Sequence, residues 1–252
     1  GSTVQGEYEM SITTPRWQRT LALRVWMERP RRSFVRILSP AKEAGIELKL
    51  SDAQQKQENQ IKAIRAFIAQ KVDVIACSPV VESGWGTVLR EAKAANIPVI
   101  LSDRAVNEKD DSLWVSFMGS DFVEEGRKAG RWLLEKVKGE AGDVNVVELQ
   151  GTVGSGPAID RKKGFEEIIK ADPKFKIVRS QTGDFTRAKG KEVMEAFLKA
   201  EGKKINVLYA HNDDMAIGAI QAIEAAGLVP GVDIKILTID AGKDGMQALA
   251  DG

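Results

Sequence analysis

The stretch Asn96-Ile97-Pro98-Val99-Ile100-Leu101-Ser102-Asp103-Arg104 decides the fold that this sequence predicts. Residues 99–101 form an unbroken apolar run, which is typical of a strand covered on both faces, and Pro98 stands where a strand begins without needing its N–H. In open α/β sheets, ligands bind beyond the carboxyl ends of the strands. The run therefore carries Asp103 and Arg104, an acceptor beside a planar fork of donors, to a place where a small polar molecule binds.

The chain around this stretch alternates strand-like and helix-like segments from Ala44 onward. Short apolar or alternating runs predict strands at 46–50, 72–78, 98–101, 114–118, 144–149, 175–180, 207–210 and 234–239. Apolar residues at helical spacing predict helices at 57–70, 85–95, 122–137, 160–169, 187–198, 215–226 and 243–249. Strict alternation implies right-handed crossovers, so the predicted class is α/β with parallel sheets and helices on both faces.

The length of 252 residues suits two small cores better than one. The polar run 106–112 has no apolar period and is the predicted first crossing between two lobes. A strand that ends in Asp240 suggests that the chain returns there. We therefore expect an atypical Arg-rich segment at 1–40, a first lobe at 41–105 plus 238–252, and a second lobe at 108–236. Two crossings make a hinge, with a ligand site between the lobes.

The composition excludes several classes of function. Lys and Arg number 37 against 36 Asp and Glu, a net charge of +1, so neither nucleic acid nor an anionic membrane is expected as a partner. One cysteine, Cys77, excludes a disulfide framework, and one histidine with one cysteine excludes a usual zinc site. The glycine-rich loop 151–156 lacks both a P-loop lysine and the G-x-G-x-x-G spacing. No cofactor or metal is therefore expected.

Polar and aromatic side chains follow five of the predicted strands. They are Asp103 and Arg104 after 98–101, Arg161 after 144–149, Phe185 after 175–180, Asn212 after 207–210, and Asp240 after 234–239. Acids, an amide and guanidiniums pair with hydroxyls that both donate and accept, and an aromatic ring covers the apolar face of a sugar. A purely structural role is the alternative for some of the neighbouring residues. Residues 184–186 could only cap the following helix, and Asp213 and Asp214 could be acids that the dipole of a helix favours in its first turn.

The same side chains could belong to an enzyme or to a binding protein. Asp103 and Asp240 form a candidate carboxylate pair for glycoside hydrolysis, which needs two acids at a sugar cleft. We expect nearby arginines to keep both acids ionised, whereas a general acid needs a raised pKa. His211 is the single imidazole, and no G-x-S-x-G motif accompanies it. Binding without catalysis is therefore favoured, and a glycosidase is the weaker alternative.

Several motifs in one order give the sequence a family resemblance from about Ala44 to Gly252. They are Asp52-Ala53-Gln54-Gln55-Lys56-Gln57-Glu58-Asn59-Gln60, Ser78-Pro79-Val80-Val81 with Gly84-Trp85, Asp103-Arg104, Ile159-Asp160-Arg161-Lys162-Lys163-Gly164-Phe165, Gly183-Asp184-Phe185, and His211-Asn212-Asp213-Asp214-Met215-Ala216-Ile217-Gly218. Together they resemble the type I periplasmic sugar-binding proteins of ABC transporters. The resemblance is to the ribose/galactose-binding class, and is strongest to its galactofuranose-binding branch.

The resemblance implies two Rossmann-like lobes that close on one pentose or hexose, galactofuranose among the candidates, and deliver it to an ABC permease. It implies that Asp103 and Arg104 bind hydroxyls from the first lobe, that Arg161, Phe185 and Asn212 bind from the second, and that Asp240 binds from the hinge. It also implies a monomer that works without a cofactor in the periplasm or outside the cell. The sequence carries no recognisable signal peptide.

Two departures from the family pattern shape these expectations. Residues 1–40 do not match the strand and aromatic-bearing loop with which the family begins, and the family continues beyond Gly252. We therefore expect an incomplete first lobe. A related alternative is the effector domain of a sugar-responsive repressor, which needs a preceding helix-turn-helix that the proline-containing segment 1–40 does not supply.

Overall fold

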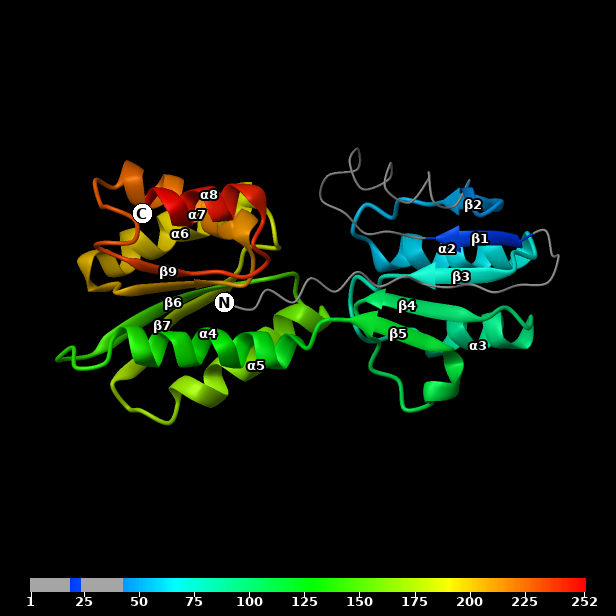
Figure 1. Ribbon diagram of the computed structural model, residues 1–252, viewed down its shortest axis with the longest axis horizontal. Helices are drawn as coiled ribbons and strands as arrows, with labels where there is room; N and C mark the ends of the chain where they lie inside the picture. The colour runs from blue at the N-terminus through cyan, green and yellow to red at the C-terminus, as the bar shows by residue number, and fades with distance from the viewer. Residues whose placement is uncertain (1–18, 24–42) are drawn as a thin grey trace.

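The computed structural model describes residues 43–252 and the backbone of 19–23, arranged as two α/β lobes (Figure 1). The first lobe contains β1 (Arg19–Leu23), β2 (Ile46–Leu50), α2 (Gln57–Ala69), β3 (Val74–Cys77), α3 (Gly86–Ala94), β4 (Val99–Asp103), the 3₁₀ turn η1 (Asp111–Leu113) and β5 (Ser116–Gly119). The second contains α4 (Phe122–Lys136), β6 (Val144–Gln150), α5 (Gly156–Ile169), β7 (Phe175–Thr182), α6 (Arg187–Glu201), η2 (Gly202–Lys204), β8 (Val207–Ala210), α7 (Asp213–Ala225), β9 (Lys235–Leu237) and α8 (Lys243–Asp251).

Each lobe is built on one parallel sheet. The strand order is β2-β1-β3-β4-β5 in the first lobe and β7-β6-β8-β9 in the second. Every recorded pairing is parallel, which confirms the predicted α/β class. The strand order reverses between β1 and β3 and again between β6 and β8, and such switch points open a crevice at the carboxyl ends of the strands. The loops that carry the predicted site residues leave the sheets at these ends.

Helices cover both faces of the second sheet, and strand residues alternate between them. Val146 packs with Phe165 in a core under α4 and α5, whereas Val147 packs with Met194 in a core under α6 and α7. The first lobe has a core around Trp85 between its sheet, α2 and α3. These cores give the cleft-facing loops a rigid base. None of the helices in the described ranges is long and apolar enough to cross a membrane.

One strand lies where the sequence analysis found no regular element. β1 pairs in parallel with β2 on one side and β3 on the other, so it is an interior strand of its sheet. The expectation that regular structure begins at Ala44 was therefore wrong for residues 19–23. Three consecutive apolar residues, Leu21, Ala22 and Leu23, are too few to reveal a period amid arginines. The rest of the predicted Arg-rich segment, 1–18 and 24–40, lies outside the described residues.

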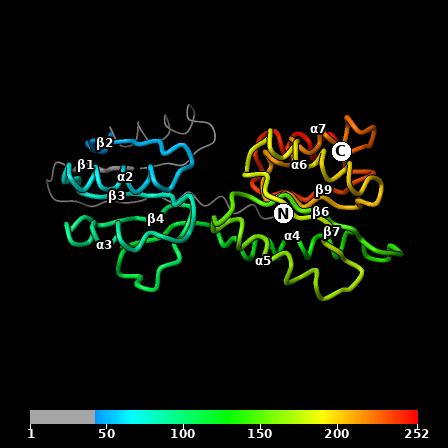
Figure 2. The backbone as a smooth tube through the Cα atoms, turned by 180° about the vertical axis from the view of Figure 1, so that it is seen from behind, coloured from blue at the N-terminus to red at the C-terminus, as the bar shows by residue number. Residues whose placement is uncertain are grey.

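The structure also divides the chain differently from the sequence prediction. β5 pairs with β4, so the polar run 106–112 lies within the first lobe and the chain crosses after Gly119 (Figure 2). α8 packs on α7 of the second lobe, whereas the sequence analysis assigned 238–252 to the first. Polar contacts hold α8 there, because Arg187 Nη2 donates to Asp244 Oδ2 at 2.8 Å. A polar run marks a surface loop as readily as a domain boundary.

Candidate functional site

The two lobes meet at loops that follow their strands. The N–H of Glu82, after β3, donates to the carbonyl of Gly154, after β6, at 2.9 Å. The guanidinium carbon of Arg104, after β4, lies 5.4 Å from the centre of the Phe185 ring, after β7. Since both pairs join strand ends of different sheets, the carboxyl edges of the two sheets face one another. The candidate site is the cleft between these edges.

Three hydrogen bonds hold the guanidinium of Arg161 in the second lobe. Its Nε donates to Glu125 Oε2 at 2.9 Å, its Nη1 to the His211 carbonyl at 2.6 Å, and its Nη2 to Asp240 Oδ1 at 3.2 Å. Its guanidinium carbon also lies 5.1 Å from the centre of the Phe122 ring. Contacts from α4 and from the loops after β8 and β9 fix the orientation of the guanidinium, and the residue is only 6 % exposed. A fixed fork of donors suits a hydroxyl ligand.

The helix that carries Arg161 begins earlier than the sequence analysis predicted. α5 starts at Gly156, four residues before the predicted Asp160, because Ser155 caps it by accepting from the Ala158 N–H and a proline occupies its first turn. Arg161 therefore lies within a regular helix rather than at its edge. The helical backbone adds to the rigidity of the side chain.

The carboxylate of Asp240 bonds to Arg161 and is still partly exposed to solvent. Its side chain is 47 % exposed although it pairs with Arg161. Burial of the carboxylate raises the pKa of Asp240 to about 6; Arg161 opposes this rise, and the charges of Asp213 and Glu125 add to it. The group is thus an acceptor at neutral pH that takes up a proton in mildly acidic solution.

Asp103 and Arg104 form the wall of the first lobe. Arg104 is buried and its Nη1 donates to the Val80 carbonyl at 3.1 Å. The side chain of Asp103 is 55 % exposed, with Oδ2 3.6 Å from Arg104 Nε. Partial burial raises the pKa of Asp103, although Arg104 and Arg161 both act to lower it. The charge of Arg161, on the opposite wall, acts to lower the pKa of Asp103, so the two walls interact electrostatically.

The pKa values correct one step of the sequence argument. Neighbouring arginines were expected to hold Asp103 and Asp240 ionised and so to prevent a raised pKa, yet the pKa of each carboxyl is raised. The cost of removing a carboxylate from water outweighs the nearby positive charge at these two positions. The expected sign was therefore wrong, because burial cannot be judged from the sequence.

Phe185 and Asn212 act as one unit. The Phe185 ring is buried against Gly151, where an added Cβ would lie only 1.9 Å from the ring atom Cζ. Asn212 caps α7, since its Oδ1 accepts from the Met215 N–H at 3.1 Å, and its Nδ2 donates to the Phe185 carbonyl at 3.2 Å. Asn212 therefore fixes the aromatic loop as well as lying at the predicted strand end.

Three of the predicted site residues have left-handed backbone conformations. The φ angles are 65° at Asp103, 58° at Phe185 and 107° at Asp240. For residues other than glycine such a conformation costs about 1 to 2 kcal/mol, and residues that adopt it cluster at ligand sites. The six predicted residues form two contact groups: Asp103, Arg104, Phe185 and Asn212 are connected in that order, and Arg161 bonds to Asp240.

The structure shows what residues 184–186, Asp213 and Asp214 do at the helix N-termini. Thr186, not Asp184, caps α6. Asp213 accepts from the Gly242 N–H at 2.6 Å, and Asp214 Oδ1 accepts from Arg187 Nη2 at 2.7 Å. Both acids of the first turn of α7 thus have structural partners.

The sequence analysis missed Glu125 and Glu148. Glu125 accepts from Arg161, but an acid in the first turn of a helix gives no separate signal. Glu148 lies fully buried and accepts from Lys162 and His211. A carboxylate inside the otherwise apolar strand 144–149 is a signal that would have found it, since an unpaired charge is costly there. Within the described ranges, no group of three or more His, Cys, Asp or Glu side chains is arranged to hold a metal ion.

Comparison with known proteins gives consistent matches. The family described as "Periplasmic binding protein domain" matches residues 31–252. The galactofuranose-binding protein YtfQ of Escherichia coli (strain K12) is 58% identical, over 85% of this chain and 67% of the relative. The ribose import binding protein RbsB of Bacillus subtilis (strain 168) is 33% identical, over 84% of this chain and 65% of the relative. The chain thus spans about two thirds of the length of these curated relatives.

Solved structures match over most of the chain. A crystal structure of a galactofuranose binding protein has a TM-score of 0.88 at 54% identity, covering 93% of this chain and 80% of that one. The binding protein component of the arabinose ABC transporter from Shewanella sp. ANA-3, bound to α- and β-L-arabinofuranose, has a TM-score of 0.86 at 54% identity. It covers 92% of this chain and 78% of that one.

Proposed function

We propose, since the chain belongs to the periplasmic binding protein family, that it binds one furanose sugar between its two lobes. Three of the relatives named above are described by galactofuranose or arabinofuranose, which favours a furanose ring. The observation that carries the proposal is the placement of the fixed Arg161–Asp240 pair opposite the Asp103–Arg104 pair, at facing edges of two parallel sheets.

The side chains of the two walls suit neighbouring hydroxyls. A hydroxyl donates to the carboxylate of Asp103 or Asp240 and accepts from the guanidinium beside it. The buried Phe185 ring offers an apolar surface for the C–H face of the sugar. Because the protein already orients Arg161, this side chain loses little conformational entropy when the sugar binds.

Lobe closure gives this arrangement its selectivity. A sugar that touches both walls binds more tightly to the closed arrangement than to an open one, and that difference in affinity drives closure. The lobe contacts at Glu82 and Gly154 support a closed arrangement in this structure. One of the matched structures is named as the periplasmic binding protein component of an arabinose ABC transporter, which supports delivery of the sugar to a permease from the periplasm. We expect the protein to act as a monomer.

Relatives at this level of identity are named for binding and import. We therefore propose no hydrolytic activity for the Asp103 and Asp240 carboxyls. Incubation with aryl furanosides is the check, and released phenol above the rate of an Asp240→Asn variant would contradict this part of the proposal.

A sugar panel tests the proposal. Tryptophan fluorescence and thermal shift are measured with L-arabinose, D-galactose, D-fucose, D-ribose and D-fructose, with sucrose as a control too large for a monosaccharide cleft. We expect a saturable response to one or more of the monosaccharides and none to sucrose. A folded sample that responds to no sugar in either assay would contradict the proposal.

A further inference from the structure

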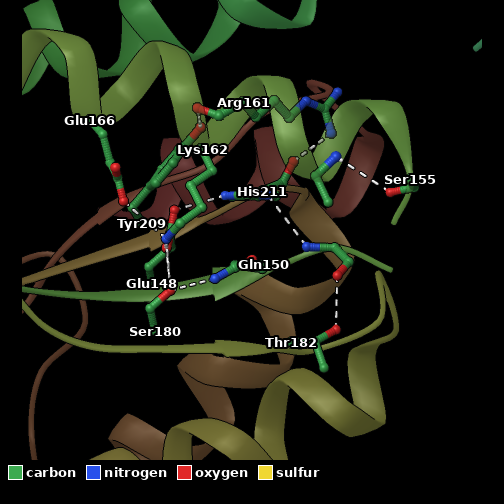
Figure 3. A network of polar contacts seen from close by, with 12 residues as sticks. Glu148, Gln150, Ser155, Arg161, Lys162, Glu166, Ser180, Thr182, Tyr209 and His211 are labelled. Carbon is green, nitrogen blue, oxygen red and sulfur yellow. Dashed lines mark hydrogen bonds and ion pairs between the residues drawn. The ribbon is translucent and has the colours of Figure 1, made fainter. Parts of the chain in front are cut away.

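A buried charged cluster lies behind Arg161, on the face of the second sheet that α4 and α5 cover (Figure 3). Glu148 of β6 and His211 after β8 have no exposed side-chain surface, and Lys162 of α5 is 31 % exposed. Lys162 Nζ donates to Glu148 Oε2 at 2.7 Å, and His211 Nε2 lies 3.1 Å from Glu148 Oε1. Ser180 Oγ also donates to Glu148 Oε2. Both oxygens of this buried carboxylate therefore have hydrogen-bond partners.

The protonation state of the cluster follows from its hydrogen bonds. The Gly151 N–H donates to His211 Nδ1 at 3.4 Å, so the ring proton lies on Nε2 and is donated to Glu148. Burial lowers the pKa of His211 and keeps the imidazole neutral. Burial alone would raise the pKa of Glu148, but donors from His211, Lys162 and Ser180 outweigh it and lower the pKa to about 2. Glu148 is therefore a carboxylate at neutral pH.

Two of the partners of Glu148, Lys162 and His211, are connected directly to Arg161. Lys162 is the next residue on α5, so its ion pair with Glu148 anchors the helix turn that carries Arg161. His211, held by Glu148 through its ring, accepts from Arg161 Nη1 through its main-chain carbonyl at 2.6 Å. Tyr209, two residues before His211, donates from its hydroxyl to the Arg161 carbonyl at 3.4 Å. The backbone and the guanidinium of Arg161 are thus tied to one buried acid by separate routes.

We propose that Glu148 is a positioning residue for Arg161, acting through Lys162 and His211 to hold the guanidinium where the sugar meets it. The inference rests on the proposed function. Glu148 itself lies behind the wall of the cleft and does not contact the ligand in this account. A binding group works only when the groups that support it lock its orientation, so loss of the support weakens binding without removing a direct contact.

The first test compares two acids that share Lys162. Glu148→Gln keeps the shape of the side chain but replaces one acceptor with a donor that faces Lys162 and Ser180. Glu166→Gln is the matched control, because Glu166 Oε1 also accepts from Lys162, at 3.1 Å, on the outer side of α5. We expect Glu148→Gln to weaken binding of the best sugar of the panel about tenfold and Glu166→Gln to change it less than twofold. Equal effects of the two variants would overturn the proposal.

The second test is a rescue at His211. Glutamine at this position has both an acceptor for the Gly151 N–H and a donor for Glu148, whereas leucine has neither. We expect His211→Gln to keep affinity within about threefold and His211→Leu to lose about tenfold. Should Glu148→Gln fail to fold, Lys162→Met and this pair of variants carry the test, and an equal affinity for His211→Gln and His211→Leu would count against the proposal.

A readout without sugar separates this inference from the proposed function. The Arg161 Nε–Hε signal in ¹⁵N relaxation spectra reports the mobility of the guanidinium itself. We expect it to be rigid in the wild type and in Glu166→Gln, and mobile in Glu148→Gln. If no sugar binds to the wild type, the proposed function fails while this signal still decides the positioning role. An Arg161 signal that stays rigid in folded Glu148→Gln would overturn the inference, whatever the sugar affinity.

Discussion

The two walls of the cleft differ in how far the protein has already ordered them. In the second lobe, Arg161 donates to acceptors from α4, the end of β8 and the loop after β9, at 2.6 to 3.2 Å. In the first lobe, Asp103 is half exposed, and its nearest contact with Arg104 is 3.6 Å. Both walls combine a buried guanidinium with a half-exposed acid, but Arg161 lies 3.2 Å from its acid, Asp240, whereas Arg104 lies 3.6 Å from Asp103.

The difference suggests a division of labour. A wall with fixed donors supplies affinity, because the ordering cost was met during folding. A wall with an open carboxylate gains its partners when the sugar arrives, and so contributes more to the coupling between binding and closure. We therefore expect the ordered wall to carry the larger share of the binding free energy.

Removal of Arg161 is expected to have the largest effect on binding. Arg161→Met deprives the sugar of a charged donor and leaves Glu125 and Asp240 without it, so we expect at least a 100-fold loss of affinity, about 3 kcal/mol. Arg127→Met is the control, since Arg127 pairs with Glu167 on the exposed side of α4 at 2.9 Å. Isothermal titration calorimetry measures both. A larger loss for Asp103→Asn than for Arg161→Met would reverse the comparison of the walls.

The buried support of the second wall is expected to be sensitive to acid. The pKa of Glu148 is about 2 in the folded chain and 4.5 when free, so its contribution to stability is present above about pH 4.5 and is lost as pH falls toward 2. We expect up to about 3 kcal/mol of the free energy of unfolding to disappear in this window. Urea unfolding between pH 2.5 and pH 7 measures it.

Glu148→Gln serves as the control for this acid dependence. The variant should be less stable than the wild type at pH 7 and should show a flatter dependence of stability on pH below 4.5. Parallel curves for the two proteins would mean that Glu148 does not carry the effect.

A single methyl group is expected to disturb the aromatic surface of the second wall. A Cβ at Gly151 would lie 1.9 Å from the Phe185 ring, so Gly151→Ala must displace the ring, and we expect about a tenfold loss of affinity. A Cβ at Gly156 meets no atom within 4 Å, which makes Gly156→Ala a matched control with affinity near that of the wild type. Calorimetry on the pair checks this, and equal affinities would show that the ring position is unimportant.

The open carboxylate of the first wall should matter less. Asp103→Asn keeps one acceptor oxygen and loses the charge, and the site remains ordered by Arg161, so we expect about a fivefold loss of affinity. The melting temperature without sugar should stay within about 1 °C, because the carboxylate is half exposed. A drop of several degrees in differential scanning fluorimetry would show that the first wall is also part of the structural network.

The pH dependence of binding gives the smallest expected effect. Asp240 has a pKa of about 6 and accepts hydroxyls only when ionised, so affinity should fall as pH drops through 6. Protonation of this one group predicts about a fourfold loss between pH 7 and pH 5.5. The dependence should be absent in Asp240→Asn. A wild-type affinity that does not change over this range would contradict the role of Asp240 as an acceptor.

The sequence predicted the alternation of elements and the side chains at strand ends, because both follow from local periodicity and from the geometry of parallel sheets. Asp103, Arg161 and Asp240 were found in this way. The buried partners of Arg161 were not, because Glu148 contacts residues 14 and 63 positions away in the chain. Pairings over such distances are set by packing, which one sequence does not display.

The lobe boundaries were harder to predict for a related reason. The lobe of β5 depends on its pairing with β4, and that of α8 on contacts such as Arg187 with Asp244. Neither leaves a local pattern. The signs of the pKa shifts at Asp103 and Asp240 depended in the same way on burial, which only the folded chain reveals.

The central claim is that one sugar touches both walls at once. A crystal structure of this chain with its best-binding furanose tests that claim directly. The account predicts sugar hydroxyls within 3.2 Å of an Asp103 or Arg104 side-chain atom on one side and of Arg161 or Asp240 on the other. A sugar that contacts one wall alone, or that binds away from these side chains, would contradict it.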